Sequence, residues 1–153
     1  MARSYAVTIA QGTVTTTANF CGIQQTVASP VTRGRIFEFI FGSSITPADY
    51  ASKLSIMRLT TALSTGGNTS VAGVMIDAAD GASQILGFTG NTGGATLSSV
   101  LLAVGVNMRA TFRWVAAPTK ELTIAATQYL GIGMVVQAQS TTYTPDATLL
   151  WEE

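Results

Sequence analysis

The chain is built from short runs in which apolar residues recur at every second position, and this period limits the folds that it can adopt. The clearest run is residues 34–42, GRIFEFIFG, in which Phe37, Phe39 and Phe41 would share one face of an extended strand. The opposite face carries Glu38 between two isoleucines. Because both faces are largely apolar, we expect a central strand that is covered on both sides.

Other strand-like segments are rich in threonine, β-branched and aromatic residues, and turn residues separate them. They are residues 4–10, 13–27, 52–63, 100–107, 110–116, 128–138 and 146–153. A helix is an alternative for residues 52–63, although the serines and threonines there favour a strand. One short helical turn is conceivable after Pro47 and another from Asp77.

About eight strands with few helices predict an all-β fold, a single antiparallel β-sandwich domain spanning residues 1–153. A jelly roll is the leading variant, because it distributes eight strands over two sheets. A seven-stranded immunoglobulin-like sandwich is the alternative, without the cysteine pair of antibody domains. A chain of this length can bury roughly 70% of its unfolded surface, which is enough for a core without metals or disulfides.

Residues 77–99, DAADGASQILGFTGNTGGATLSS, match no regular pattern and are predicted to form a long glycine-rich loop. Loops of more than about 12 to 15 residues are usually functional or disordered. The opening DAADG is superficially similar to a calcium loop. Its acids are three apart and no glutamate follows at the twelfth position, so a turn is predicted, with isolated calcium binding as the alternative.

The sequence contains no histidine, the commonest general base and metal ligand. Cys21 is the single cysteine and is predicted to be a buried, inert thiol. Glu38, in its apolar strand, is explained by an ion pair with Arg58 or Arg113. We therefore predict a chain that is not an enzyme, with no catalytic residue, no metal site and no cofactor. A glycan hydrolase, which would need two carboxylates in a cleft, is the disfavoured alternative.

Charge and hydropathy exclude further classes of function. Eight basic and eight acidic residues give a net charge of zero, so we expect no general electrostatic attraction to nucleic acid. No apolar run approaches the 18 residues or so that a membrane span requires. The N-terminal segment lacks the apolar stretch of a secretory signal, and we expect the chain to fold in a reducing cytoplasm.

The final segment, DATLLWEE, is predicted to be a strand paired inside the sandwich, with Trp151 in the core. Glu152 and Glu153 would then hold the end of the strand in water and oppose edge-to-edge pairing. Three aromatic residues lie in or near predicted loops, where a ring can stack on a sugar or fill a pocket of a partner. They are Tyr50, Phe88 and Tyr143.

The two ends, MARSYAVTI at residues 1–9 and ATLLWEE at residues 147–153, together resemble those of a family of small β-sandwich structural proteins of tailed bacteriophages. Two central segments are similar to that family as well: RGRIFEFIFGSS at residues 33–44 and LSIMRLTTALSTGGNTS at residues 54–70. The similarity spans nearly the whole chain and consists of short structural motifs. No catalytic residue is associated with them.

This resemblance implies a virion protein made in the host cytoplasm, and first a capsid decoration or cement protein on the capsid surface. The expected partners are the major capsid protein and further copies of the chain, as a homotrimer. A carbohydrate- or receptor-binding tail module and another head or tail component are the alternatives. We expect residues 1–5 and the loop at residues 77–99 to supply contacts, with these candidate residues: Met1, Ala2, Arg3, Tyr5, Phe88, Asn91 and Tyr143.

Overall fold

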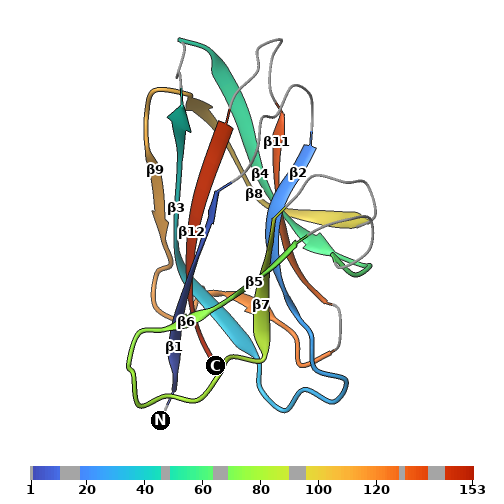
Figure 1. Ribbon diagram of the computed structural model, residues 1–153. Coiled ribbons are helices and arrows are strands. Elements are labelled where there is room, and N and C mark those ends of the chain that lie inside the picture. Colours follow the sequence, from blue (N-terminus) through green and yellow to red (C-terminus); the bar gives the residue numbers. More distant parts are fainter. Residues whose placement is uncertain are drawn as a thin grey trace.

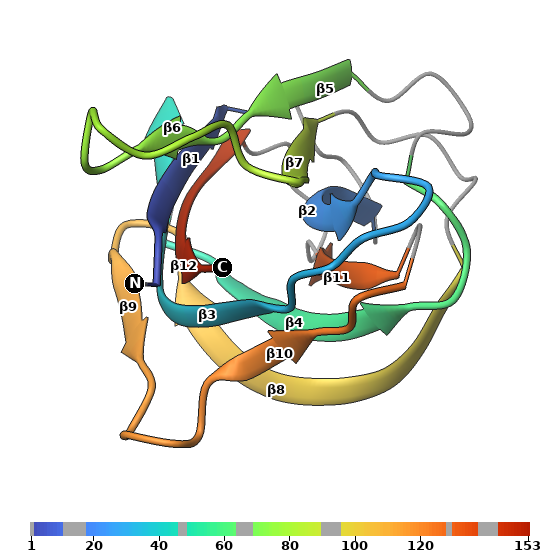
Figure 2. The ribbon, with the colours of Figure 1, turned by 90° about the horizontal axis from the view of Figure 1, so that it is seen from below.

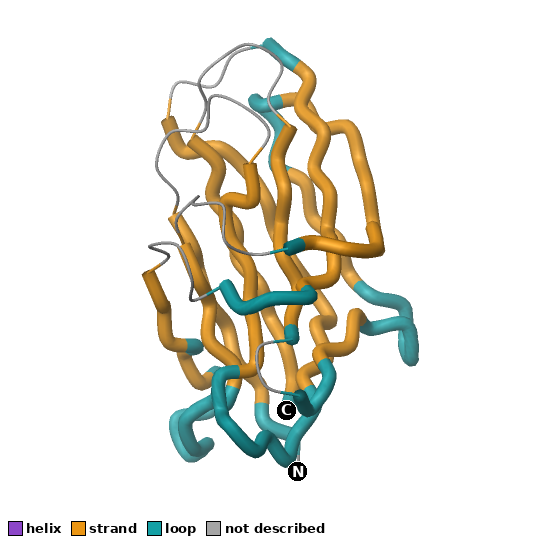
Figure 3. Tube along the Cα trace, turned by 90° about the vertical axis from the view of Figure 1, so that its right-hand side faces the viewer, coloured by secondary structure: helices purple, strands orange, loops and turns teal. Residues whose placement is uncertain are grey.

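The computed structural model describes residues 2–10, 18–45, 49–63, 69–89, 96–127, 130–137 and 144–153. In these ranges the chain forms strands joined by loops and turns, and no helix (Figure 3). The strands are β1 (Ser4–Ala10), β2 (Ala18–Gln25), β3 (Gly34–Ile45), β4 (Ala51–Leu59), β5 (Thr69–Ala72), β6 (Val74–Met75), β7 (Ile85–Thr89), β8 (Leu97–Asn107), β9 (Phe112–Val115), β10 (Leu122–Ile124), β11 (Gly131–Gln137) and β12 (Thr144–Glu152).

Two antiparallel sheets face each other across one core (Figure 1). The first sheet has the order β10-β3-β12-β1-β6, and β9 also pairs with β3. The second sheet has the order β5-β7-β2-β11-β4-β8. Seen from below, β1 and β12 lie on one side of the interior and β2 and β11 on the other (Figure 2). The predicted all-β sandwich is confirmed.

Eight of the strands follow the connectivity of a jelly roll, in which the chain is folded back on itself and then rolled into two sheets. β1 pairs with β12, β2 with β11, β3 with β9 and β4 with β8. These pairs divide into the four-strand orders β1-β12-β3-β9 and β2-β11-β4-β8. The remaining short strands are insertions: β5, β6 and β7 between β4 and β8, and β10 between β9 and β11.

Strand β12 is central to the first sheet, with β1 on one side and β3 on the other. Its side chains alternate between buried and half-buried along all nine residues. Trp151 is fully buried and stacks on Tyr5 with 5.7 Å between the ring centroids. A Cβ atom at Gly73 would lie 2.6 Å from the Trp151 ring, so only glycine fits there. The predicted role of Trp151 in the core is confirmed.

A β-bulge in β3 overturns one sequence-based prediction. Leu150 lies opposite Glu38 and Trp151 lies opposite Ile36, which leaves Phe37 as the extra residue of β3. The bulge shifts the alternation by one position. Ile36 therefore joins Phe39 in the core, whereas Phe37 is only partly buried. The prediction that Phe37 shares one face with Phe39 and Phe41 is therefore wrong for Phe37.

The predicted loop at residues 77–99 is also corrected. It contains β7, which pairs with β2 and β5, and the first residues of β8. Of the two conceivable helical turns, the one after Pro47 is replaced by the start of β4 at Ala51. The other is a turn closed by a 3.0 Å hydrogen bond from the Asp80 N–H to the Asp77 carbonyl, as expected from DAADG.

Candidate interaction surfaces

Strand β8 is the outermost strand of the second sheet, and one of its edges is open. It pairs with β4 along the other edge, and none of the described strands lies beyond it (Figure 2). Alternate residues of an antiparallel strand direct their N–H and C=O groups to opposite sides. About half of the backbone polar groups of β8 therefore face away from the sheet, where they can pair with another extended chain.

The sequence of β8, LSSVLLAVGVN, has none of the residues that usually protect a sheet edge. It contains no acid, no lysine or arginine and no proline. A register shift between Met57 and Leu59 interrupts the ladder, and so does a bulge at Leu101, between the pairs Ile56–Leu102 and Met57–Val100. Beyond this bulge Val100 is 55% exposed. The strand was predicted at residues 100–107, but its open edge was missed, and the only signal was this run without charges.

The other outer strands of the described sheets differ from β8 in length. β5 and β9 have four residues, β10 has three and β6 has two, whereas β8 has eleven. Short edge strands offer few backbone groups to a partner. Within the described part of the chain, β8 is therefore the one long edge that remains available for pairing.

A shallow hollow of about 320 Å³ adjoins this edge. Its lining is mostly small and apolar, and Lys53 is the one charged residue in it. A Cβ atom at Gly105 would meet no atom within 4 Å. The hollow leaves room beside the open edge for side chains of a partner. Its lining consists of Ala51, Ser52, Lys53, Ala103, Val104 and Gly105.

The lower end of the sandwich, near the N-terminal residues, joins the two sheets. The Glu153 carboxylate accepts hydrogen bonds from the Ser83 hydroxyl and from the backbone N–H groups of Gln84, at 3.1 Å, and Ile85, at 3.2 Å. It also accepts one from the indole N–H of Trp151, at 3.3 Å. The prediction that Glu153 holds the end of the strand in water is wrong, because its carboxylate links β12 to the start of β7.

The predicted partner contacts separate into three groups. Ala2 and Arg3 are exposed, so they remain available to a partner. Tyr5 and Phe88 are buried in the core, with 0% and 4% of their surface exposed, so the prediction of direct partner contact is corrected for both. Met1, Asn91 and Tyr143 lie outside the described residues.

Burial also determines the chemistry of Tyr5. Its hydroxyl donates a 2.8 Å hydrogen bond to the Gly81 carbonyl. Removal from water raises the pKa of Tyr5, and the nearby negative charge of Glu153 raises it further. The phenol therefore stays protonated and acts as a structural donor. Phe88 packs with Leu59 and Leu63 in a small second cluster, which accounts for its burial.

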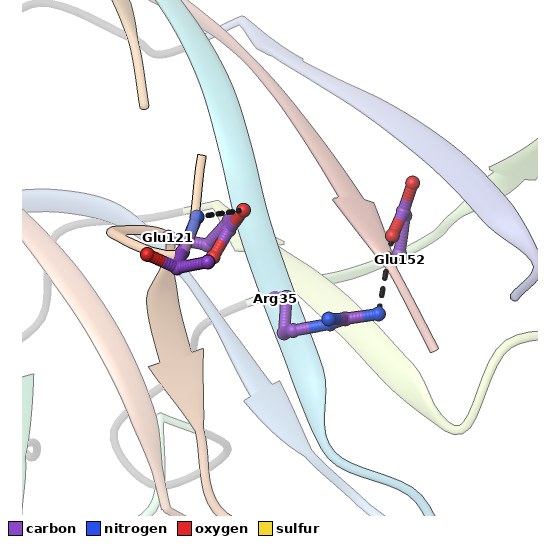
Figure 4. A network of polar contacts seen from close by, with 4 residues as sticks. Arg35, Glu121 and Glu152 are labelled. Carbon is purple, nitrogen blue, oxygen red and sulfur yellow. Dashed lines mark hydrogen bonds and ion pairs between the residues drawn. The ribbon is translucent and has the colours of Figure 1, made fainter. Parts of the chain in front are cut away.

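Charged side chains on the first sheet bind other groups of the same fold. In Figure 4, Arg35 reaches Glu152, with 3.4 Å between Nη2 and Oε2, and both side chains are more than a third exposed. Glu121 instead accepts a 3.1 Å hydrogen bond from the backbone N–H of Thr119, whose φ of 68° is unusual for a residue other than glycine. Such exposed contacts contribute at most about 1 kcal/mol.

Glu38 pairs with Arg113, one of its two predicted partners. The Arg113 Nε atom lies 2.6 Å from Oε1 of Glu38, and this hydrogen bond lowers the pKa of the carboxyl group. The other predicted partner, Arg58, donates to the Thr123 carbonyl at 2.9 Å. Cys21 is buried, and desolvation raises the pKa of its thiol well above the ordinary value, as expected for an inert cysteine.

A polar pocket of about 190 Å³ lies between β3 and β12, beside the start of β9. Asp146 Oδ1 and Ser43 Oγ are buried there without a hydrogen-bond partner. Thr111 and Thr148 add two hydroxyl groups to the lining. Buried polar groups usually have partners, so two unpaired oxygens in one pocket are unusual. The lining therefore combines a carboxylate side chain with three hydroxyl-bearing side chains, a composition suited to a small polar ligand.

In the described ranges, no three histidine, cysteine or acidic residues cluster as metal ligands would. The same ranges contain no helix long and apolar enough to cross a membrane. Comparisons with protein-family models, with curated proteins and with solved structures gave no match.

Proposed function

We propose that this chain is a non-catalytic structural protein of a tailed-phage virion, and within that class a capsid decoration protein. The observation that carries the proposal is the long, uncharged open edge of β8 on a compact jelly roll. Such an edge provides backbone hydrogen bonds and apolar contacts for assembly with a further protein chain, a second copy included, without requiring any reactive group. Jelly rolls are common among viral capsid domains, which agrees with this role by analogy of fold.

The proposed mechanism is contact with the assembled shell. A protein that binds only the assembled state of the major capsid protein stabilises that state by mass action. Several contacts per particle, made by a self-associating decoration protein, raise the effective affinity of each copy. The zero net charge supports a protein partner over a nucleic acid, because no surplus of basic residues would neutralise phosphates. The protein would act on the outer surface of the virion.

The absence of histidine from the whole sequence supports a non-catalytic role. The carboxylates with the shortest contacts also support it. Glu38 is engaged with Arg113, and Glu153 is engaged with the backbone N–H groups of Gln84 and Ile85. These contacts are of the kind that stabilise a fold.

Particles assembled without this protein provide the test. The purified protein is added to them, bound copies are counted after sedimentation, and the temperature of particle disruption is measured. We expect saturable binding and a higher disruption temperature. Free protein that stays in the supernatant at every concentration would refute the decoration role. Albumin at equal concentration is the control for nonspecific sedimentation.

A carbohydrate-binding tail module is a second candidate, and the pocket at Asp146 favours it. Carboxylates and hydroxyls are suitable partners for the hydroxyl groups of a sugar. Among the predicted aromatic residues, Tyr50 is 44% exposed, whereas Phe88 is buried. A glycan array probed with the wild type and with Asp146→Ala tests this candidate. Binding that is lost in the variant would support a tail module, and a blank array would leave decoration as the remaining candidate.

A further inference from the structure

We infer that β8 pairs with β8 of a second copy of this chain, antiparallel about a two-fold axis. The two second sheets would then form one continuous sheet across both copies. This inference rests on the proposed function, because it names a further copy of the chain as the partner of the same edge. It goes further by identifying the strand, the symmetry and the register, and it replaces the homotrimer implied by the family resemblance with a dimer.

The chemistry of the edge requires an extended chain as the partner. The outward N–H and C=O groups of β8 recur along the strand, and only another strand can match this spacing. Water can satisfy these groups, but exposed Val100 and the hollow beside Ala103 gain nothing from water. A partner strand satisfies the polar groups and covers the apolar surface at the same time.

Charge favours a second copy as that strand. A two-fold axis places each strand opposite itself, so a charged residue would face an equal charge at short distance, which is unfavourable. β8 carries no charged residue, so this repulsion does not arise. Lys53, the charged residue in the lining of the hollow, belongs to β4, where it lies opposite Gly105, and is one strand removed from the axis. Every copy also presents the same edge at the same concentration.

The register follows from the faces of β8. Leu102 and Val106 lie opposite Ile56 and Ser52 of β4, and they share the inner face with Val104. An axis through Val104 places Leu102 opposite Val106 of the second copy and therefore keeps the inner residues together. The same axis places Ala103 opposite Gly105 on the outer face. This register uses the regular part of β8 and leaves out the bulge at Leu101.

Light scattering coupled to size-exclusion chromatography tests the pairing with three variants. Ala103→Lys and Ala103→Glu each place a charge on the exposed face next to the axis. Ala72→Lys is the matched control, because Ala72 is an exposed alanine in β5, the opposite edge of the same sheet. We expect a wild-type dimer, a dissociation constant raised roughly tenfold or more in each Ala103 variant, and no change in the control.

A mixture of Ala103→Lys with Ala103→Glu should recover the dimer, because the opposite charges then lie across the axis. Recovery also shows that both variants are folded. A wild-type monomer or trimer, a dimer that the Ala103 variants do not weaken, or a mixture that stays monomeric would overturn the pairing. Equal weakening by Ala72→Lys would indicate head-to-tail pairing and would also overturn it. None of these outcomes affects capsid binding by the wild type, which tests the decoration role separately.

Discussion

Strands β12 and β8 are both long and largely apolar, and their positions in the fold are opposite. β12 lies between β1 and β3, and its buried side chains include Leu149 and Trp151. β8 has a neighbour among the described strands on one side only, and of its eleven residues only Val106 is buried. The comparison shows that apolar alternation predicts a strand but not the number of its neighbours.

The two strands also differ in their charged residues. β12 carries Asp146 and Glu152 although it is paired along both edges, and β8 carries no charge although one edge is open. Protection of edges would favour the reverse arrangement. A protein that assembles through β8 accounts for this distribution, because charges there would oppose the assembly.

The largest expected effect is at the buried centre of β12. Trp151→Ala should lower the free energy of unfolding by about 3 to 5 kcal/mol, because it removes a fully buried ring that packs on Tyr5 and Gly73. Leu150→Ala, on the half-buried opposite face, is the control and should cost about 1 kcal/mol or less. Urea denaturation, monitored by far-ultraviolet circular dichroism so that the signal does not depend on Trp151, measures the free energy of unfolding of both variants. Equal losses would show that β12 is not packed as described.

Glycines extend the comparison to a second pair of positions. Gly131 lies in β11, where an added Cβ would be 2.1 Å from the Ile23 carbonyl oxygen, and Gly105 of β8 has open space around it. We expect Gly131→Ala to cost about 1 to 3 kcal/mol, because the backbone of β2 would have to move. Gly105→Ala should change stability by no more than about 0.5 kcal/mol. Thermal denaturation of both variants measures these stability changes. A Gly131→Ala variant as stable as the wild type would contradict the close approach of β2 and β11.

Much of the fold could be predicted because it depends on local pattern. The positions of β1, β3 and β12, the burial of Trp151 and the sandwich itself follow from two-residue alternation. Phe37 could not be assigned correctly, because a bulge depends on the partner strand, and its sequence reads as uninterrupted alternation. Strand β7, ILGFT, was missed since it is short and lies between glycine-rich stretches.

The candidate surfaces were harder to predict, because they depend on which strands are neighbours. Phe88 was expected in a loop and is instead buried against Leu63. Glu153 was expected in water, and its partners, from Ser83 to Ile85, are about 70 residues away in sequence. Only the folded topology identifies β8 as an edge strand. Once that position is known, the lack of charges in β8 indicates an edge that is not protected against pairing.

The carboxylate at the end of β12 should give an intermediate effect. Glu153→Gln removes the charge that accepts hydrogen bonds from the start of β7, and we expect a loss of about 1 to 2 kcal/mol. Glu152→Gln is the neighbouring control, because its pair with Arg35 is exposed and should contribute less than about 1 kcal/mol. Guanidinium denaturation of both variants is the measurement. A greater loss from Glu152→Gln would contradict the link between the two sheets.

The smallest expected effect concerns β9, a short edge that carries the kind of charge β8 lacks. Arg113 lowers the pKa of Glu38 below its ordinary value of 4.5, so the ionised carboxylate stabilises the fold above that pH. This contribution is lost as the pH falls below about 4.5 and through the lowered pKa. In Arg113→Met the pKa of Glu38 is no longer lowered by this partner, and less stability should be lost over the same pH interval.

Denaturation midpoints of the wild type and Arg113→Met, measured at pH 7 and at about pH 3, test this expectation. The two midpoints should differ at pH 7 and converge in acid, where Glu38 is protonated in both proteins. Parallel pH curves would show that Arg113 does not stabilise the ionised carboxylate. The oligomeric state should not change, because β9 has four residues and cannot replace β8 as a pairing edge. New self-association of Arg113→Met would show that charge, and not length, protects the short edges.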